Sequence, residues 1–400
     1  MEINTNILII HNHYKLAGGE DTVVENEAQL LRRHGYNVLL YTRSNCDIDS
    51  FTVMDKLLLP FSSIFSWRTY REVSSILKQQ NISLIHVHNT LSLISPSVYW
   101  AAFKYHVPVV QTLHNFRLLC PNATFMRAGK CCEECLEKGL HTAVIHKCYR
   151  NSRLQTLLGA VILKVHRLLG TYRKLYYICL SEFNKEKLLK VNRGKKHIVD
   201  ISRVFVKPNF CLAHADIVPF ENRKNYFVYI GRLEILKGIY LLLQAWRNVE
   251  GSELHLYGTG PEEEGVKEFI HIYGLKKVRL FGHTEHNTLM HDLSYAKALI
   301  LPTQCYEGMP MSIIESYACG TPVIGSNIGN TNQMILEGYT GISFQYDSPE
   351  ALSRAVQTLP AFNSFDIFRH YEEHYGAESN YKLLKRIYDH VIADSSQVRH

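Results

Sequence analysis

The sequence predicts an α/β protein with two Rossmann-like, doubly wound domains that face each other across a cleft. Short β-branched or apolar runs alternate with amphipathic helical segments along most of the chain, which is typical of parallel sheets. This alternation occurs in two series, separated by the irregular stretch Lys207-Pro208-Asn209. Ligands of such sheets bind at the carboxyl ends of the strands, so we expect the active site between the domains.

The first series predicts an amino-terminal domain over residues 1–206. Its strands are expected at residues 6–12, 37–42, 83–89, 108–115, 176–181 and 198–206. Residues 153–174 read as a basic amphipathic helix, because leucines recur at helical spacing among Lys and Arg side chains. Such a helix could rest on an anionic bilayer, and packing within the domain explains the same apolar stripe.

The second series predicts a carboxyl-terminal domain over residues 207–375. Its strands are expected at residues 226–233, 253–257, 278–282, 298–302, 322–325 and 341–344, with helices at 239–249 and 311–318. A terminal segment over residues 376–400 carries one last helix at 378–393, which we expect to pack back on the amino-terminal domain.

The composition of the chain limits the kinds of molecule that we expect it to bind. The net charge of +7 arises from 44 basic and 37 acidic residues, and the bases are scattered, so we do not expect nucleic-acid binding. Phosphate-bearing small molecules or an anionic membrane surface fit better. The longest apolar run, Leu157 to Leu163, is far shorter than the roughly 20 residues that span a bilayer. Residues 1–10 make a poor signal peptide, so we expect a cytoplasmic protein, peripheral on the inner face of the plasma membrane.

The strongest motif combines a strand end, a turn and a helix. The apolar run that ends at Pro302 is followed by Thr303-Gln304-Cys305-Tyr306-Glu307-Gly308-Met309-Pro310-Met311, and Glu315 lies eight positions after Glu307. Two turns of helix separate the acids, so both can address one ligand, one at sugar hydroxyls and the other at ribose hydroxyls. The free amides at the helix start favour a nearby diphosphate. A solvent-facing helix with incidental acids is the alternative.

A second motif places two cations after another strand. Gly231-Arg232 ends the run that begins at Tyr226, and Lys237 follows five positions after Arg232. A guanidinium and an ammonium there could clamp both phosphates of a departing nucleoside diphosphate and neutralise its growing charge. The pair would replace the metal ion that many transferases need, so no cofactor is expected for catalysis. A solvated surface pair is the alternative.

These motifs, together with Leu256 to Pro261 and Phe281-Gly282-His283, resemble the retaining glycosyltransferases of family 4, of the type that builds surface polysaccharides. The resemblance implies the GT-B fold, with an acceptor-binding amino-terminal domain over residues 1–206 and a nucleotide-sugar-binding carboxyl-terminal domain over residues 207–375. It also implies that Arg232 and Lys237 bind the diphosphate, that Glu307 meets the donor sugar and that Glu315 binds the ribose. The donor-binding set that it implies is Gly18, Gly19, Gly231, Arg232, Lys237, Tyr257, Gly258, His283, Glu307, Gly308, Met309, Pro310, Met311 and Glu315.

The amino-terminal series supplies two further candidates. Gly18-Gly19 precedes a helix and permits close backbone approach to a phosphate or sugar, although such a pair is also an ordinary turn. It resembles the family's glycine loop. His114 ends a predicted strand and resembles the family histidine that contacts the donor sugar. We assign it to positioning, because the family's favoured front-face attack sends the acceptor's proton to the leaving phosphate. A structural histidine is the alternative, as expected for His86 and His88.

Half of the ten cysteines lie between Cys120 and Cys148. Cys120, Cys132, Cys135 and Cys148 offer four thiolates around one Cys-x-x-Cys pair, which suits a closed structural zinc site. Reduced thiols and disulfides are the alternatives.

The functional prediction is a retaining hexosyltransferase with Glu307, His114, Arg232 and Lys237 in catalytic roles. It moves a sugar from a nucleotide-sugar, UDP-linked by family frequency, to a glycan or lipid-linked acceptor in polysaccharide biosynthesis, such as capsule or exopolysaccharide. One alternative is a non-catalytic sugar-nucleotide-binding subunit of a heteromeric transferase. The other is a nucleotide-sugar epimerase of the same fold.

Overall fold

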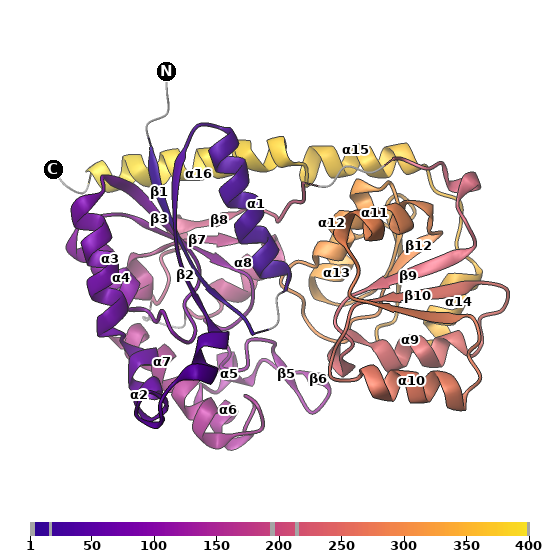
Figure 1. The fold of residues 1–400 in the computed structure, drawn as a ribbon, viewed down its shortest axis with the longest axis horizontal. Helices are drawn as coiled ribbons and strands as arrows, with labels where there is room; N and C mark the ends of the chain where they lie inside the picture. Colours follow the sequence, from indigo (N-terminus) through magenta and orange to yellow (C-terminus); the bar gives the residue numbers. More distant parts are fainter. Residues whose placement is uncertain (1–4, 16–17, 193–196, 213–215, 398–400) are drawn as a thin grey trace. The chain divides into compact units, whose positions relative to one another are not determined.

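The computed structural model describes residues 5–15, 18–192, 197–212 and 216–397 (Figure 1). The chain divides into two compact units. Unit 1 comprises residues 1–125, 132–208 and 380–400, and unit 2 comprises residues 126–131 and 209–379. Within the described residues, no helix combines the length and apolar character that a membrane span requires.

Unit 1 is built on a six-stranded, wholly parallel sheet with the strand order β2-β1-β3-β4-β7-β8. Its central strands are almost fully buried, as a sheet covered on both faces requires. The strands are β1 (Asn6–His13), β2 (Asn37–Ser44), β3 (Ile82–Asn89), β4 (Val109–Leu113), β7 (Tyr176–Cys179) and β8 (Val204–Val206).

The helices of unit 1 come mostly from the segments between these strands, and the last one comes from the carboxyl-terminal part of the chain (Figure 1). Leu384, Ile387, Tyr388 and Val391 of that last helix join the core formed by β1, β3, β4 and β7. The helices are α1 (Gly19–Arg33), α2 (Val53–Ile64), α3 (Trp67–Gln79), α4 (Ser97–Lys104), α5 (Glu134–Glu137), α6 (His141–Ile145), α7 (Arg153–Leu168), α8 (Glu182–Leu189) and α16 (Ala377–Gln397).

Unit 2 contains a second six-stranded parallel sheet, in the order β11-β10-β9-β12-β13-β14. It also includes the short antiparallel hairpin of β5 (Met126–Arg127) and β6 (Lys130–Cys131). The sheet strands are β9 (Tyr226–Ile230), β10 (Glu253–Tyr257), β11 (Val278–Gly282), β12 (Ala298–Leu301), β13 (Val323–Ser326) and β14 (Gly341–Phe344).

Helices cover both faces of this sheet, and each face has its own apolar core (Figure 1). One face is covered by α9 (Ile239–Trp246), α10 (Glu263–Ile272) and α14 (Pro349–Gln357). The other is covered by α11 (His286–Tyr295), α12 (Met311–Ala318), α13 (Gly329–Met334) and α15 (Ser364–His374). Two doubly wound parallel sheets confirm the predicted fold class.

Three predicted segments differ from the structure. Residues 198–203 are not strand, because the Asp200 carboxylate accepts the Ser202 amide and closes a 3-10 turn before β8 begins. The helix predicted to reach Lys174 ends at Leu168, where Gly170 turns the chain with φ of 65°. The hairpin at 126–131 was placed in the first domain but belongs to unit 2, and its strands pair with each other rather than with the sheet of unit 1.

Candidate functional site

The Lys237–Glu307 pair lies at the carboxyl ends of two neighbouring strands of unit 2, β9 and β12. The Lys237 ammonium contacts both Glu307 carboxylate oxygens, at 2.7 and 2.8 Å. The Thr303 hydroxyl donates to the same carboxylate at 2.8 Å. Burial would lower the pKa of Lys237, but the charge of Glu307, the nearby Cys305 and the hydrogen bond to Glu307 together raise that pKa above its ordinary value. The ammonium therefore stays charged at neutral pH.

Close backbone packing holds this pair in place. Gly238 has φ of 75°, and a Cβ there would lie 1.8 Å from the carbonyl oxygen of Pro302. Only glycine lets the turn that carries Lys237 press against the end of β12. On the other side, the Asn330 amide donates to the Glu307 carbonyl at 2.9 Å, which fixes the loop that carries the carboxylate.

Arg232 is the second cation of unit 2 and is 51% exposed. It forms an ion pair with Glu234, and its charge is close enough to lower the pKa of Lys237. The turn before it is tight: the Gly231 amide donates to the Tyr257 carbonyl at 3.1 Å. Gly258, with φ of 121°, would place a Cβ 2.1 Å from the Gly231 carbonyl oxygen. The Arg232 cation thus lies at a strand end formed by Gly231 and Gly258, and this arrangement suits the binding of a phosphate.

Glu315 lies on α12 and is 9% exposed. His286, the first residue of α11, approaches its carboxylate at 3.5 Å. The hydrogen bond to Glu315 raises the pKa of His286. We did not predict His286 from the sequence. The only sequence signal is its position three residues after His283, at the start of a helical segment.

Two further residues of the predicted donor-binding set, His283 and Tyr257, differ in exposure. His283 is exposed and follows β11. The Tyr257 ring is buried, stacks on Phe281 at 4.7 Å between centroids, and donates its hydroxyl to Asp292 at 2.6 Å. Tyr257 therefore offers its backbone, and not its ring, to a ligand.

The turn at Gly308-Met309-Pro310 leads into α12, which begins at Met311. No side chain caps this helix start, so its amides remain available to an anion. The Met309 sulfur accepts the Asn209 amide at 3.2 Å, which holds the turn against the segment that opens unit 2.

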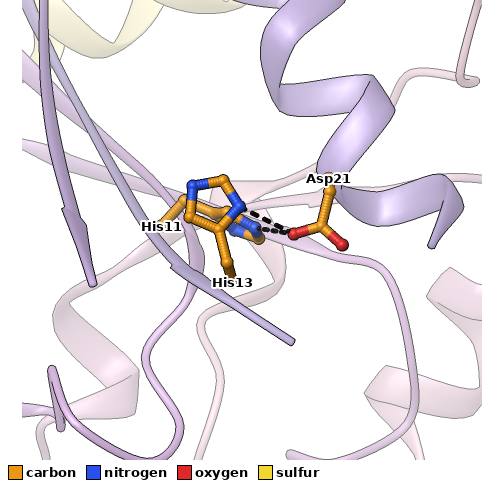
Figure 2. A group of neighbouring side chains, drawn as sticks. All are labelled: His11, His13 and Asp21. Carbon is orange, nitrogen blue, oxygen red and sulfur yellow. Dashed lines mark hydrogen bonds and ion pairs between the residues drawn. The ribbon is translucent and has the colours of Figure 1, made fainter. Parts of the chain in front are cut away.

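In unit 1, Gly18 and Gly19 begin α1 beside a cluster of two histidines and an aspartate (Figure 2). One oxygen of Asp21 contacts His11 Nε2 and His13 Nδ1, each at 2.9 Å. Its other oxygen accepts the Gly18 amide at 2.9 Å. Asp21 thus ties the glycine turn to the end of β1, and a Cβ at Gly18 would meet nothing within 4 Å.

Glu20 lies beside this cluster and is almost completely enclosed. Burial raises the pKa of Glu20 to about 8, against the lowering effect of the hydrogen bond from the Tyr14 hydroxyl. A largely protonated carboxyl group therefore stands next to Gly19 at neutral pH, where it can donate a hydrogen bond.

His114 belongs to a chain of buried polar groups in unit 1. Its Nε2 lies 2.9 Å from Nδ1 of His88, and His88 Nε2 lies 3.2 Å from Glu27. The Lys207 ammonium then contacts Glu27 at 2.6 Å. Burial lowers the pKa of His114 well below its ordinary value, so the imidazole is neutral. A neutral ring that is fixed by a neighbour suits positioning. His86 is buried between Tyr388 and Thr112, as expected for a structural histidine.

Two side-chain groups among the described residues could hold a metal ion: His11, His13 and Asp21, and Glu27, His86 and His88. In the second group Lys207 already balances the carboxylate. The predicted zinc cysteines are in neither group. Cys120 and Cys135 do lie together, and their mutual hydrogen bond raises the pKa of the Cys120 thiol and lowers that of Cys135 to about 6.

The structure thus brings Lys237 onto Glu307 and places Arg232 near both. Glu315 lies on the helix that follows the Glu307 loop, and Gly18, Gly19 and His114 belong to unit 1. Thr303, Asn330, His286 and Glu20 are the site residues that we did not predict. Thr303 lies inside the Pro302–Glu315 motif and Glu20 directly follows the Gly18-Gly19 pair, but neither was assigned a role. Asn330 and His286 stand in no predicted motif, and their contacts with the site form only on folding.

Two family models match the chain. "Glycosyltransferase Family 4" matches residues 17–200, and "Glycosyl transferases group 1" matches residues 213–361. The chain is 31% identical over 137 residues to glycogen synthase of Mycobacterium tuberculosis, an alignment covering 33% of each chain. It is 25% identical over 136 residues to the lipopolysaccharide core biosynthesis glycosyltransferase LpsE of Rhizobium meliloti, covering 34% of this chain and 39% of LpsE. These alignments span about a third of each curated relative.

Solved structures show the same fold at lower identity. Anabaena Alr3699/HepE in complex with UDP and glucose aligns with a TM-score of 0.65 and 16% identity, covering 96% of this chain and 99% of HepE. Sucrose-phosphate synthase from Thermosynechococcus elongatus aligns with a TM-score of 0.63 and 17% identity, covering 99% and 98%. Because the two family models together match residues 17–200 and 213–361, the chain belongs to the family 4 glycosyltransferases of the GT-B fold.

Proposed function

We propose that this protein is a retaining glycosyltransferase that moves a hexosyl unit from a UDP-linked sugar to a glycan or lipid-linked acceptor in polysaccharide synthesis. The observation that carries the proposal is the contact of Lys237 with Glu307 beside Arg232. A carboxylate for sugar hydroxyls and two cations for a diphosphate are the groups that donor cleavage needs.

The chemistry follows from the donors that these residues offer. An ammonium has three N–H groups, so Lys237 can keep its contacts with both Glu307 oxygens and still donate to a phosphate oxygen. Arg232 is half exposed, and it can turn from Glu234 to the second phosphate. Positive charge fixed before the reaction stabilises the diphosphate as it departs. The leaving phosphate can then accept the acceptor's proton.

The relatives supply the choice of donor and pathway. HepE was solved with UDP and glucose, which supports a UDP-hexose, and LpsE is named for lipopolysaccharide core biosynthesis. In unit 1, Gly18, Gly19 and the neutral His114 would contact the donor and acceptor. Work at the inner face of the plasma membrane fits the Cys120–Cys135 thiol pair, because thiols persist in the reducing cytoplasm.

A panel of UDP-, GDP- and ADP-linked sugars tests the proposal. The expected donor raises the melting temperature, because it binds the native state, and it is hydrolysed or transferred. The product's anomeric configuration, read by NMR, should match that of the donor. Glu307→Gln should remain folded and lose activity. Normal transfer by that variant would overturn the site assignment, and release of a free epimerised sugar would identify an epimerase. Binding without turnover would identify a non-catalytic subunit.

Two statements about metals complete the proposal. Catalysis should need no metal, because Arg232 and Lys237 supply the positive charge, so EDTA should leave the rate unchanged. A structural zinc ion held by Cys120, Cys132, Cys135 and Cys148 would require these loops to close further around the Cys120–Cys135 pair. Metal analysis of the purified protein tests it: one zinc per chain, lost in Cys132→Ser, is the expected result.

A further inference from the structure

Helix α2 exposes an unusual amount of apolar surface. Only Ser63 of its 12 residues is buried. Its large apolar side chains follow the spacing i, i+1, i+4, i+5 and i+8, which gathers them on one side of the helix. They are Val53 (77% exposed), Met54 (63%), Leu57 (63%), Leu58 (52%) and Phe61 (71%). Isolated apolar residues are common on protein surfaces, but a continuous face of this kind marks an interaction site.

The neighbouring helix α7 also exposes apolar side chains. The two helices are in contact, and His166 of α7 bonds the Ile64 carbonyl at the end of α2 at 3.0 Å. Leu154 (75% exposed) and Leu157 (47%) lie in the first turns of α7. We call this surface the docking face. It comprises Val53, Met54, Leu57, Leu58, Phe61, Leu154 and Leu157.

The chain around α7 carries charge of one sign. Residues 138–181 contain no Asp or Glu. All of their Lys and Arg residues except Arg167 are exposed. The basic residues are Lys138, Lys147, Arg150, Arg153, Lys164, Arg167, Arg173 and Lys174. The one acid of α2, Asp55, bonds Thr52 and caps the helix. An apolar face beside a run of basic residues complements an anionic lipid surface.

A pocket opens beneath the same two helices. Its volume is about 100 Å³, and it lies within unit 1. Ser63 of α2, together with Ile162 and Leu163 of α7, forms part of its wall, and His114 and Arg117 form another part. The helices that carry the docking face therefore also line the space next to His114.

We propose that the docking face binds an anionic phospholipid bilayer, with the α2 side chains inserted among the acyl chains and the basic residues of 138–181 on the head groups. A lipid-borne acceptor would then approach unit 1 along α2 and α7, whose residues line the space beside His114. This deepens the proposed function, because it assigns the acceptor's entry to α2 and α7. The expected contact with the bilayer does not require the transferase reaction.

Trp67 provides a direct probe. It is 64% exposed and begins α3, three positions after the last residue of α2. Trp246 is buried and Trp100 is partly buried. We expect vesicles of phosphatidylcholine mixed with phosphatidylglycerol to bind the full chain and to shift Trp67 emission to the blue. Vesicles of phosphatidylcholine alone should bind at least tenfold more weakly, and added salt should weaken binding to the mixed vesicles. Trp67→Phe should remove the emission shift. Unchanged emission during binding would overturn the proposal.

Introducing negative charge on the apolar face provides a second test of the proposal. Leu57→Glu with Phe61→Glu should reduce co-sedimentation with the mixed vesicles at least tenfold. Ile272→Glu with Phe365→Glu, at two exposed apolar residues of unit 2, is the matched control and should bind as the wild type does. Equal binding by both double variants would refute the docking face.

Two further measurements separate the remaining outcomes. Light scattering without vesicles should show the same mass for the wild type and the Leu57→Glu/Phe61→Glu variant. A wild-type dimer that this variant dissolves would identify a second copy as the occupant and overturn the proposal. Donor hydrolysis without vesicles should be unchanged in the variant. Vesicle binding without hydrolysis in the wild type would contradict the proposed function and leave the docking face standing.

Discussion

Glu27 of unit 1 and Glu307 of unit 2 are both buried carboxylates with a lysine partner, but their surroundings differ. Glu27 is fully enclosed, and its ring of partners is closed by Lys207, His86 and His88. Glu307 faces a lysine whose side chain is 30% exposed, with the half-exposed Arg232 nearby. The first arrangement leaves no place for a ligand on the carboxylate. The second leaves N–H donors of Lys237 and Arg232 available to a ligand. This difference separates a structural charge cluster from a binding site.

The largest effect should follow from a substitution of Glu27 that breaks its contact with Lys207. Glu27→Gln leaves the Lys207 ammonium buried without its counter-charge, which should cost about 3–5 kcal/mol of unfolding free energy. Denaturant unfolding monitored on unit 1 measures the loss. Glu25→Gln, on an exposed position of the same helix, is the control and should change little. A Glu27→Gln variant as stable as the control would mean that the cluster is not the structural unit described.

Removing Lys237 from its contact with Glu307 should affect activity more than stability. Lys237→Ala removes a charge that acts on the leaving diphosphate, and we expect kcat/KM to fall about 10²–10³-fold. Steady-state assays with the donor found in the panel measure it. Lys267→Ala, an exposed lysine paired with Glu263 and Glu264, should retain full activity. A variant that loses stability and keeps its rate would place Lys237 with the structural charges.

Arg232 sharpens the comparison at the exposed edge of the site. Arg232→Ala should weaken UDP binding about tenfold or more, because a charge-assisted hydrogen bond to phosphate is lost. Calorimetry at low and high salt checks this, and the wild-type affinity should be the more salt-sensitive. Arg247→Ala is the control, since that exposed guanidinium packs on Tyr273. Identical UDP affinity in Arg232→Ala and the wild type would exclude Arg232 from the diphosphate site.

The smallest effect concerns the protonated acid beside the glycine turn. The pKa of Glu20 is raised to about 8 in the folded state, from an ordinary value of 4.5. The unfolded chain therefore releases this proton first, and the raised pKa costs the wild type stability as pH rises from about 4.5 to 8. Glu20→Gln should thus gain a few degrees of melting temperature relative to the wild type between pH 5 and pH 8. A constant difference across that range would contradict the shift.

The periodic parts of the fold could be predicted from the sequence. The strands at 253–257, 278–282 and 341–344 and the helix at 311–318 agree with the structure to the residue. Errors lie at ends, where a local hydrogen bond decides. The Asp200 side chain converts a predicted strand into a turn. Strand β9 ends at Ile230 instead of Leu233, and the Tyr229 hydroxyl donates to the Arg232 carbonyl just beyond that end.

The site was predictable only where a motif carries it. Lys237 and Glu307 stand 70 positions apart and were paired through two recognisable turns. His286 and Asn330 reach the site from helices without any such turn. Lys207 was read as part of a linker, yet it is fully buried, because the charge of Glu27 attracts it from 180 positions away. Pairings of this kind depend on the folded chain and leave no local pattern.

Because of helix α16, unit 1 can complete its core only after residues 377–397 have been synthesised. Four of its apolar side chains complete the core around β1 and β3, Asn380 holds Lys207 at 3.0 Å, and the Tyr388 hydroxyl bonds His86 at 2.7 Å. A ribosome releases these residues after all of unit 2 has emerged. Unit 2 can therefore reach its native state on the nascent chain, while unit 1, although translated first, must wait with an unfinished interior that chaperones would have to shield.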